Sequence, residues 1–254
     1  MRQMIDFTGD WRFAKTAEVP VALPGSWEAV TLPHTWNAVD GQDGGNDYWR
    51  GTAMYAKAFP CPELEPGGRA VLEFLGAAMT AEVWLNGQKL AHHEGGYSTF
   101  RVDITDALRN ENLLCASVDN GENDRVYPQK ADFTFYGGLY RGVNLICVPV
   151  SHFELCEDGT PGIKVTPIVD LEKKTACVTV ETWQNEGTVE FTANGETQRV
   201  PSIDGYAKAE FTIENVRLWD GVDDPYLYTA AAKLDSGDEI TTRFGCRKFE
   251  IDPQ

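Results

Sequence analysis

AEVWLNGQKLAHHEGGYSTFRVDIT, residues 81–105, contains a β-hairpin signature followed by a strand of alternating polarity. Asn86-Gly87 is the strongest short hairpin signal, because both central positions of a type I′ turn need a positive φ. Residues 88–94 are then expected to form the returning strand. The following strand places its apolar side chains on one face, and these are Phe100, Val102 and Ile104. The stretch therefore predicts antiparallel β-structure with one buried face.

The segments on either side of this hairpin also read as short strands. Residues 16–47 are the exception, because they are rich in Pro, Gly, Asp and Asn and are expected to wrap over a sheet as irregular loops. About eight short strands with almost no helix indicate a two-sheet sandwich of jelly-roll kind over residues 1–150. The other expected strands cover residues 4–14, 52–59, 69–74, 112–120 and 141–150.

A second β-domain is expected over residues 151–254. The boundary falls near residues 150–162, where the chain runs into a Gly/Pro turn. About seven alternating strands follow, and Asn194-Gly195 supplies another hairpin turn. This spacing is typical of an immunoglobulin-like sandwich, although the disulfide signature of antibody domains is missing. The predicted fold is therefore all-β, with two sandwiches in succession.

Composition limits the function classes. The 254 residues carry a formal net charge of −17, which disfavours nucleic acid and anionic membranes as partners because phosphates require clustered Lys and Arg. The six cysteines are scattered, without zinc-ligand spacing, and reduced thiols are expected. The N-terminus lacks the apolar core of a secretory signal, so a cytoplasmic protein is expected. The acids of the loop 40–47 do not have EF-hand spacing, so a flexible loop is favoured over a calcium site.

No catalytic residues can be assigned from the sequence. The four histidines are not accompanied by a serine or cysteine nucleophile motif, and adjacent His92 and His93 should point to opposite faces of a strand. Glu111 and Glu186 lie in turn-like stretches of β-domains, and we assign neither a catalytic role. The alternating βα pattern of a TIM barrel is absent.

The stretch DFTFYGGLYR, residues 132–141, concentrates aromatic side chains around paired glycines. Aromatic rings can stack on the C–H faces of a sugar, and an acid can fix its hydroxyl groups. Gly137 and Gly138 allow a positive φ and a close backbone approach. Taken alone, these aromatics fit core positions between strands at least as well as sugar contacts.

With four further segments in the same order, this stretch resembles the N-terminal part of glycoside hydrolase family 2, the family of β-galactosidases, β-glucuronidases and β-mannosidases. The family's catalytic barrel should follow, and the chain stops at Gln254. The resemblance therefore implies a non-catalytic N-terminal fragment of a retaining β-galactosidase-type enzyme, inactive alone. The other matching segments are LPHTWN (32–37), YWRGTAMYAKAF (48–59), residues 81–105 and DDPYLYTAAAKL (223–234).

The resemblance also implies substrate-binding residues. Asp132 matches the acid that reaches into the barrel's active site, where it binds a substrate hydroxyl and, in some members, a monovalent cation. Tyr48 and Arg50 match a loop that leans toward the same site, and either Asn46 or Asn37 could supply an active-site amide. No other cofactor is implied. The alternative for all of these residues is packing against the barrel.

The implied partners are a β-galactoside or related carbohydrate and the catalytic barrel, in an enzyme expected to be a homo-oligomer. Arg141 is expected to pair with an acid inside the sandwich. Surfaces that pack on the barrel should be apolar, so the fragment is expected to self-associate. Three alternatives stay open: a freestanding carbohydrate-binding module, a purely structural module that serves assembly, and a β-glucuronidase or β-mannosidase parent.

Overall fold

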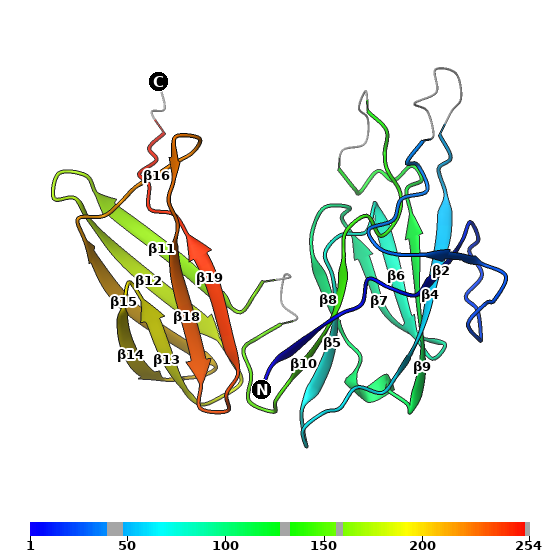
Figure 1. The fold of residues 1–254 in the computed structure, drawn as a ribbon, viewed down its shortest axis with the longest axis horizontal. Helices are drawn as coiled ribbons and strands as arrows, with labels where there is room; N and C mark the ends of the chain where they lie inside the picture. Colours follow the sequence, from blue (N-terminus) through cyan, green and yellow to red (C-terminus); the bar gives the residue numbers. More distant parts are fainter. Residues whose placement is uncertain (40–47, 128–132, 156–159, 252–254) are drawn as a thin grey trace. The chain divides into compact units, whose positions relative to one another are not determined.

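The computed structural model of the chain describes residues 1–39, 48–127, 133–155 and 160–251. They form two compact units (Figure 1). The jelly-roll unit comprises Gln3–Glu65 and Arg69–Cys147. The immunoglobulin-like unit comprises Val148–Gln254 and also takes in Met1–Arg2 and Pro66–Gly68.

The regular structure of the described residues is β throughout, apart from the single 3-10 turn η1 (Thr105–Ala107). The prediction of an all-β chain is thus confirmed. No helix in the described ranges is long and apolar enough to cross a membrane. The five described cysteines are free thiols.

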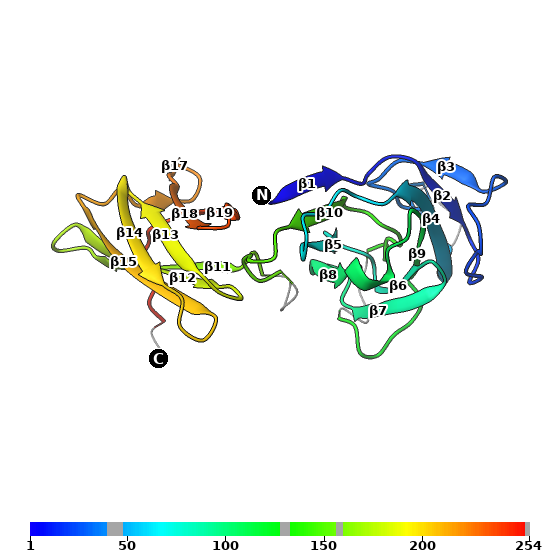
Figure 2. The same cartoon turned by 90° about the horizontal axis from the view of Figure 1, so that it is seen from below.

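The jelly-roll unit consists of two antiparallel sheets that enclose one apolar core (Figures 1 and 2). The first sheet has the order β1 (Gln3–Asp6), β10 (Val143–Val148), β5 (Arg69–Phe74), β8 (Phe100–Asp103). The second has the order β3 (Glu28–Val30), β2 (Trp11–Ala14), β4 (Thr52–Pro60), β9 (Glu111–Asp119), β6 (Thr80–Leu85), β7 (Gln88–Glu94).

The predicted hairpin forms as the sequence indicated. Asn86 and Gly87 have φ values of 54° and 83°, and they join β6 to β7. Alternation in β8 and the following residue buries Phe100, Val102 and Ile104 in the core. One prediction needs a correction here, because the stretch 16–47 is not wholly irregular: it contains β3, which pairs with β2.

The immunoglobulin-like unit also contains two facing sheets (Figure 2). Alternating side chains of both sheets build its core, as the burial of every second residue along β12 illustrates. Asn194-Gly195 forms the predicted hairpin turn, with φ values of 51° and 81°. One sheet has the order β11 (Ile163–Asp170), β12 (Thr175–Trp183), β15 (Tyr206–Glu214). The other has the order β14 (Glu196–Pro201), β13 (Thr188–Ala193), β18 (Tyr228–Leu234), β19 (Glu239–Phe244), and a small hairpin pairs β16 (Trp219–Asp220) with β17 (Asp224–Pro225).

Candidate functional site

The loops at one end of the jelly-roll unit are joined by two fully buried asparagines, Asn37 and Asn120. Asn120 follows the last residue of β9, and Asn37 lies in the long connection between β3 and β4. The side-chain nitrogen of Asn120 donates to Oδ1 of Asn37 at 3.1 Å, across 83 positions of sequence. We call this pair the amide frame, because both side chains also form hydrogen bonds to the backbone of neighbouring loops.

Asn120 fixes two loops at once. Its side-chain nitrogen also donates to the carbonyl of Phe135 at 2.8 Å, and its Oδ1 accepts from the N–H of Gly51 at 2.9 Å. Both contacts are buried or partly buried, where an unpaired backbone group would cost about 1–3 kcal/mol. The loop before β4 and the stretch after residue 132 are therefore tied to the end of β9.

Asn37 completes the frame from the other side. Its Oδ1 accepts from the N–H of Gly137 at 2.8 Å, and its side-chain nitrogen donates to the carbonyl of Trp49 at 2.9 Å. Its amide is thus used structurally, with no exposed surface. The sequence left the active-site amide open between Asn37 and Asn46. The structure gives Asn37 a structural role, and Asn46 lies outside the described residues.

The paired glycines are required by close packing, as predicted. A Cβ on Gly137 would lie 2.0 Å from the indole ring of Trp36. Gly138 has φ +126°, and a Cβ there would lie 2.5 Å from the carbonyl oxygen of His34. Any side chain at either position would displace the loop from the sandwich.

The aromatic side chains of the stretch 132–141 divide between core and surface. Phe135 is 6% exposed and packs in a small apolar cluster with Met79 and Val126, which Tyr140 also contacts. Phe133 and Tyr136, in contrast, are 52% and 39% exposed. Part of the stretch is therefore core and part is exposed, and sugar contact by the exposed rings stays a prediction.

Tyr48 and Arg50 lie beside this stretch. The guanidinium of Arg50 donates from Nε to the carbonyl of Asn120 at 2.7 Å and sits 4.9 Å from the ring centre of Phe135. Tyr48 packs against the same apolar cluster as Phe135. Among the described residues Arg50 pairs with no carboxylate. The structure thus brings two of the predicted binding residues next to the segment that follows Asp132.

Asp132 itself lies outside the described residues. What is described is the chain directly after it, from Phe133 onward, which the amide frame fixes at Phe135 and Gly137. The predicted role of Asp132 stays a prediction.

The prediction for Arg141 is wrong. Its side chain is exposed and donates to two backbone carbonyls, that of Leu75 at 3.2 Å and that of Tyr97 at 3.0 Å. It has no acidic partner in the described part of the chain, because the surrounding loops present carbonyl oxygens instead. Its observed contacts hold the loop after β7 against the end of the stretch 132–141.

Below the loops, His34 and Tyr55 form a polar pair next to Gly138. The ring nitrogen Nδ1 of His34 lies 2.7 Å from the Tyr55 hydroxyl, which is fully buried. Burial lowers the pKa of His34, and burial likewise raises the pKa of Tyr55, because both charged forms lose hydration. Both groups are therefore neutral at pH 7 and serve as a hydrogen-bonded support.

The described residues contain no group of three or more His, Cys, Asp or Glu side chains placed to hold a metal ion. The loop 40–47, weighed as a calcium site, and Asp132, weighed as a monovalent-cation ligand, both fall outside the described ranges. What the described geometry offers is a rigid backbone frame with exposed aromatic rings, which suits binding and positioning more than bond cleavage.

Sequence reasoning missed Asn120. An asparagine after a strand ordinarily reads as a turn residue, so nothing local marks it as a buried bridge. Its only sequence signal is its place at the end of β9, in line with the loops that carry Arg50 and Phe135.

The sequence matches two protein-family profiles. The profile "Glycosyl hydrolases family 2, sugar binding domain" matches residues 39–149, and the profile "Glycosyl hydrolases family 2" matches residues 157–247. A β-glucuronidase of Bacteroides fragilis is 31% identical, over 99% of this chain and 39% of the relative. A β-galactosidase of Bacteroides ovatus is 29% identical, over 99% of this chain and 32% of the relative.

Solved structures agree with these matches. An FMN-binding β-glucuronidase from Faecalibacterium prausnitzii superimposes with a TM-score of 0.85 at 39% identity, covering 96% of this chain and 39% of that one. A β-glucuronidase of Bacteroides uniformis superimposes with a TM-score of 0.84 at 26% identity, covering 99% of this chain and 33% of that one. The chain spans about two fifths or less of the length of these relatives.

Proposed function

Because the chain belongs to glycoside hydrolase family 2, of which it covers the N-terminal sugar-binding and immunoglobulin-like domains, we propose that it builds one wall of the substrate pocket of a retaining β-glycosidase. The two carboxylates that such a reaction needs, about 5 Å apart, would come from a catalytic barrel and not from these residues. The chain alone would be inactive.

The observation that carries this proposal is the amide frame. It holds the loop of Tyr48 and Arg50 beside the segment that follows Asp132, although the two are far apart in sequence. The loop that carries Tyr48 and Arg50 and the described segment after residue 132 are thus both bonded to the amide frame. Such anchoring matters because a substrate contact must be held within a fraction of an ångström to favour the transition state.

Each part of the wall would have its own task. The Asp132 carboxylate would accept a hydrogen bond from a sugar hydroxyl, and a monovalent cation is proposed to share that carboxylate. The exposed rings of Phe133 and Tyr136 would face the sugar or the barrel. Arg50, stacked on Phe135, would keep the base of the segment in place.

The same end of the unit would also dock on the barrel. Tyr97 and Tyr127 are 55% and 85% exposed, which favours contact with a partner surface. The homo-oligomeric state and the cytoplasmic location expected from the sequence belong to this proposal. Light scattering of the intact enzyme and cell fractionation test them.

The substrate would be a terminal β-glycoside. Relatives named β-glucuronidase and β-galactosidase are both similar to this chain. The proposed substrate is the β-galactoside expected from the sequence, with a β-glucuronide as the alternative. Parallel assays of the intact enzyme with the two p-nitrophenyl glycosides separate these alternatives.

The proposal is tested in an enzyme that joins this chain to a family 2 barrel. Asp132→Asn should lower kcat/KM about 10- to 100-fold, since a hydrogen bond to a charged group contributes about 1.5–3 kcal/mol. Asp106→Asn, at an exposed position in η1, is the matched control and should leave kcat/KM unchanged. Equal kinetics for Asp132→Asn and the control would refute a role in the pocket.

A second candidate function is a freestanding carbohydrate-binding module, which the exposed rings of Phe133 and Tyr127 favour. It predicts that the isolated chain binds a galactoside or a glucuronide with a Kd of about 1 mM or tighter, a range that calorimetry detects. Flat titrations with both sugars would remove this candidate and leave the pocket-wall proposal.

A further inference from the structure

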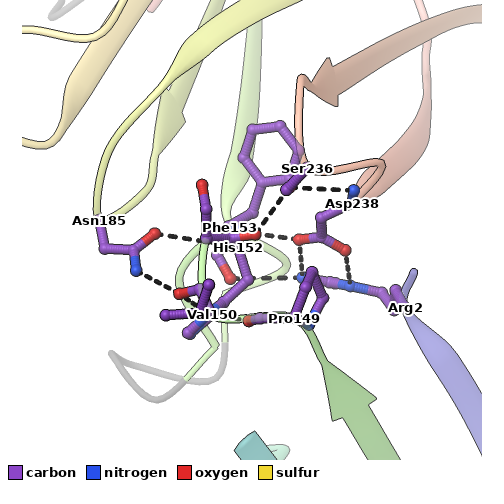
Figure 3. Close-up of polar contacts among 9 residues, drawn as sticks. Arg2, Pro149, Val150, His152, Phe153, Asn185, Ser236 and Asp238 are labelled. Carbon is purple, nitrogen blue, oxygen red and sulfur yellow. Dashed lines mark hydrogen bonds and ion pairs between the residues drawn. The ribbon is translucent and has the colours of Figure 1, made fainter. Parts of the chain in front are cut away.

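A buried carboxylate lies at the turn between β18 and β19. Asp238 has no exposed surface, and its two oxygens accept three hydrogen bonds (Figure 3). Arg2 donates from Nε to Oδ1 at 2.8 Å and from Nη2 to Oδ2 at 3.0 Å. The N–H of Phe153 donates to Oδ2 at 2.8 Å. A buried carboxylate needs such partners, because an unpaired charge in a protein interior is strongly unfavourable.

The Arg2 guanidinium also forms a hydrogen bond to the backbone of Phe153. Nη2 of Arg2 also donates to the carbonyl of Phe153 at 3.3 Å, and only 14% of the Arg2 side chain is exposed. The main chain of Phe153 therefore contacts both members of the pair. Planar, bidentate geometry of this kind selects a guanidinium over an ammonium.

Hydrogen bonds that do not involve Arg2 hold together the two segments that carry its acceptors, Phe153 and Asp238. Ser236 donates from its hydroxyl to the carbonyl of Ser151 at 2.7 Å, which ties the β18–β19 turn to the segment before Phe153. Asn185 accepts from the N–H of His152 at 3.0 Å and donates to the carbonyl of Val150 at 2.5 Å (Figure 3). All of these residues belong to the stretch Val148–Gln254.

The guanidinium itself comes from the other end of the chain. Arg2 is 236 positions away from Asp238, and Met1–Arg2 belong to the immunoglobulin-like unit, while Gln3 begins β1 of the jelly-roll unit. We propose that residues 150–153 and 236–238 form a guanidinium-binding site in the immunoglobulin-like unit, occupied by Arg2 of the same chain. Arg2 is thus part of the immunoglobulin-like unit and fills its guanidinium site.

The test combines removal of Arg2 with chemical rescue. Arg2→Ala should lower the Tm of the immunoglobulin-like unit by roughly 10 °C, because it leaves the Asp238 carboxylate buried with one partner. Methylguanidinium at about 10 mM should then raise this Tm by a few degrees by occupying the vacated site. Methylammonium at equal concentration should not, since it lacks the planar fork.

Two controls keep the test specific. Arg217→Ala removes an arginine from an exposed pair with Asp224, and neither its Tm nor its response to methylguanidinium should differ from those of the unmodified chain. The double variant Arg2→Ala/Asp238→Asn should show no response to methylguanidinium, because the carboxylate is gone.

A wild-type Tm in Arg2→Ala, or equal rescue by the two cations, would overturn the proposal. If Arg2→Ala does not fold, amide exchange at Phe153 in Arg2→Lys decides instead. Exchange at Phe153 at least 10-fold faster than in the unmodified chain supports a site selective for guanidinium, and unchanged exchange contradicts it.

Discussion

Removing the Asn120 side chain tests the amide frame directly. Asn120→Ala would leave two backbone groups without partners, the carbonyl of Phe135 and the N–H of Gly51. At about 1–3 kcal/mol for each group, and with water reaching part of the site, we expect a loss of about 3 kcal/mol in the free energy of unfolding of the jelly-roll unit. Asn37 keeps its bond from Gly137, so the frame should loosen without collapsing.

Urea unfolding and amide hydrogen exchange measure this effect. At 1.4 kcal/mol for each factor of ten, exchange at Gly51 should become about 100-fold faster. Asn123→Ala is the matched control, because Asn123 accepts a single bond, from the N–H of Arg125 at 2.9 Å, in an exposed loop. The control should lose less than about 1 kcal/mol. If Asn120→Ala unfolds like the control and exchange at Gly51 is unchanged, the amide frame does not organise these loops.

Three further predictions concern packing, protonation and thiol reactivity. Gly137→Ala should destabilise the jelly-roll unit by more than about 2 kcal/mol in urea unfolding, since its Cβ would overlap Trp36, whereas Gly25→Ala, with nothing within 4 Å, should be neutral within about 0.5 kcal/mol. Burial lowers the folded-state pKa of His34, so the unfolded chain binds a proton that the folded chain does not, and the free energy of unfolding should fall as the pH drops below about 6.5. In His34→Gln the free energy of unfolding should depend less on pH over this range. Equal pH dependence in the two proteins would contradict the assignment. Iodoacetamide should modify exposed Cys177 within minutes, as followed by mass spectrometry. It should modify Cys115 only after unfolding, because Cys115 is buried and burial raises its pKa to about 11. Equal modification rates would be inconsistent with the burial of Cys115.

The strands could be predicted because their signals are local. Alternation of apolar residues and the two Asn-Gly turns depend on neighbours within a few positions, and the structure confirms them at Asn86 and Asn194. The paired glycines of residues 137–138 were also identified locally: Gly137 lies too close to Trp36 for a side chain, and Gly138 combines a close approach with a positive φ.

The long-range bonds could not be predicted. Asn120 meets Asn37 across 83 positions, and Arg2 meets Asp238 across 236, so neither pair has a local pattern. For Arg141, in contrast, the sequence predicted an ion pair that the structure does not show. An arginine near a sandwich edge suggests an acidic partner, but the loops here offer backbone carbonyls, which no side-chain pattern reveals.

The central claim of the proposal is that this chain contributes one wall of a substrate pocket but breaks no bond itself. Turnover of p-nitrophenyl β-galactoside and β-glucuronide by the purified chain tests this claim most directly. We predict a rate equal to the buffer blank for both substrates. Hydrolysis above the blank that co-purifies with the chain, and that is lost in a variant of one of its own carboxylates, would contradict the account.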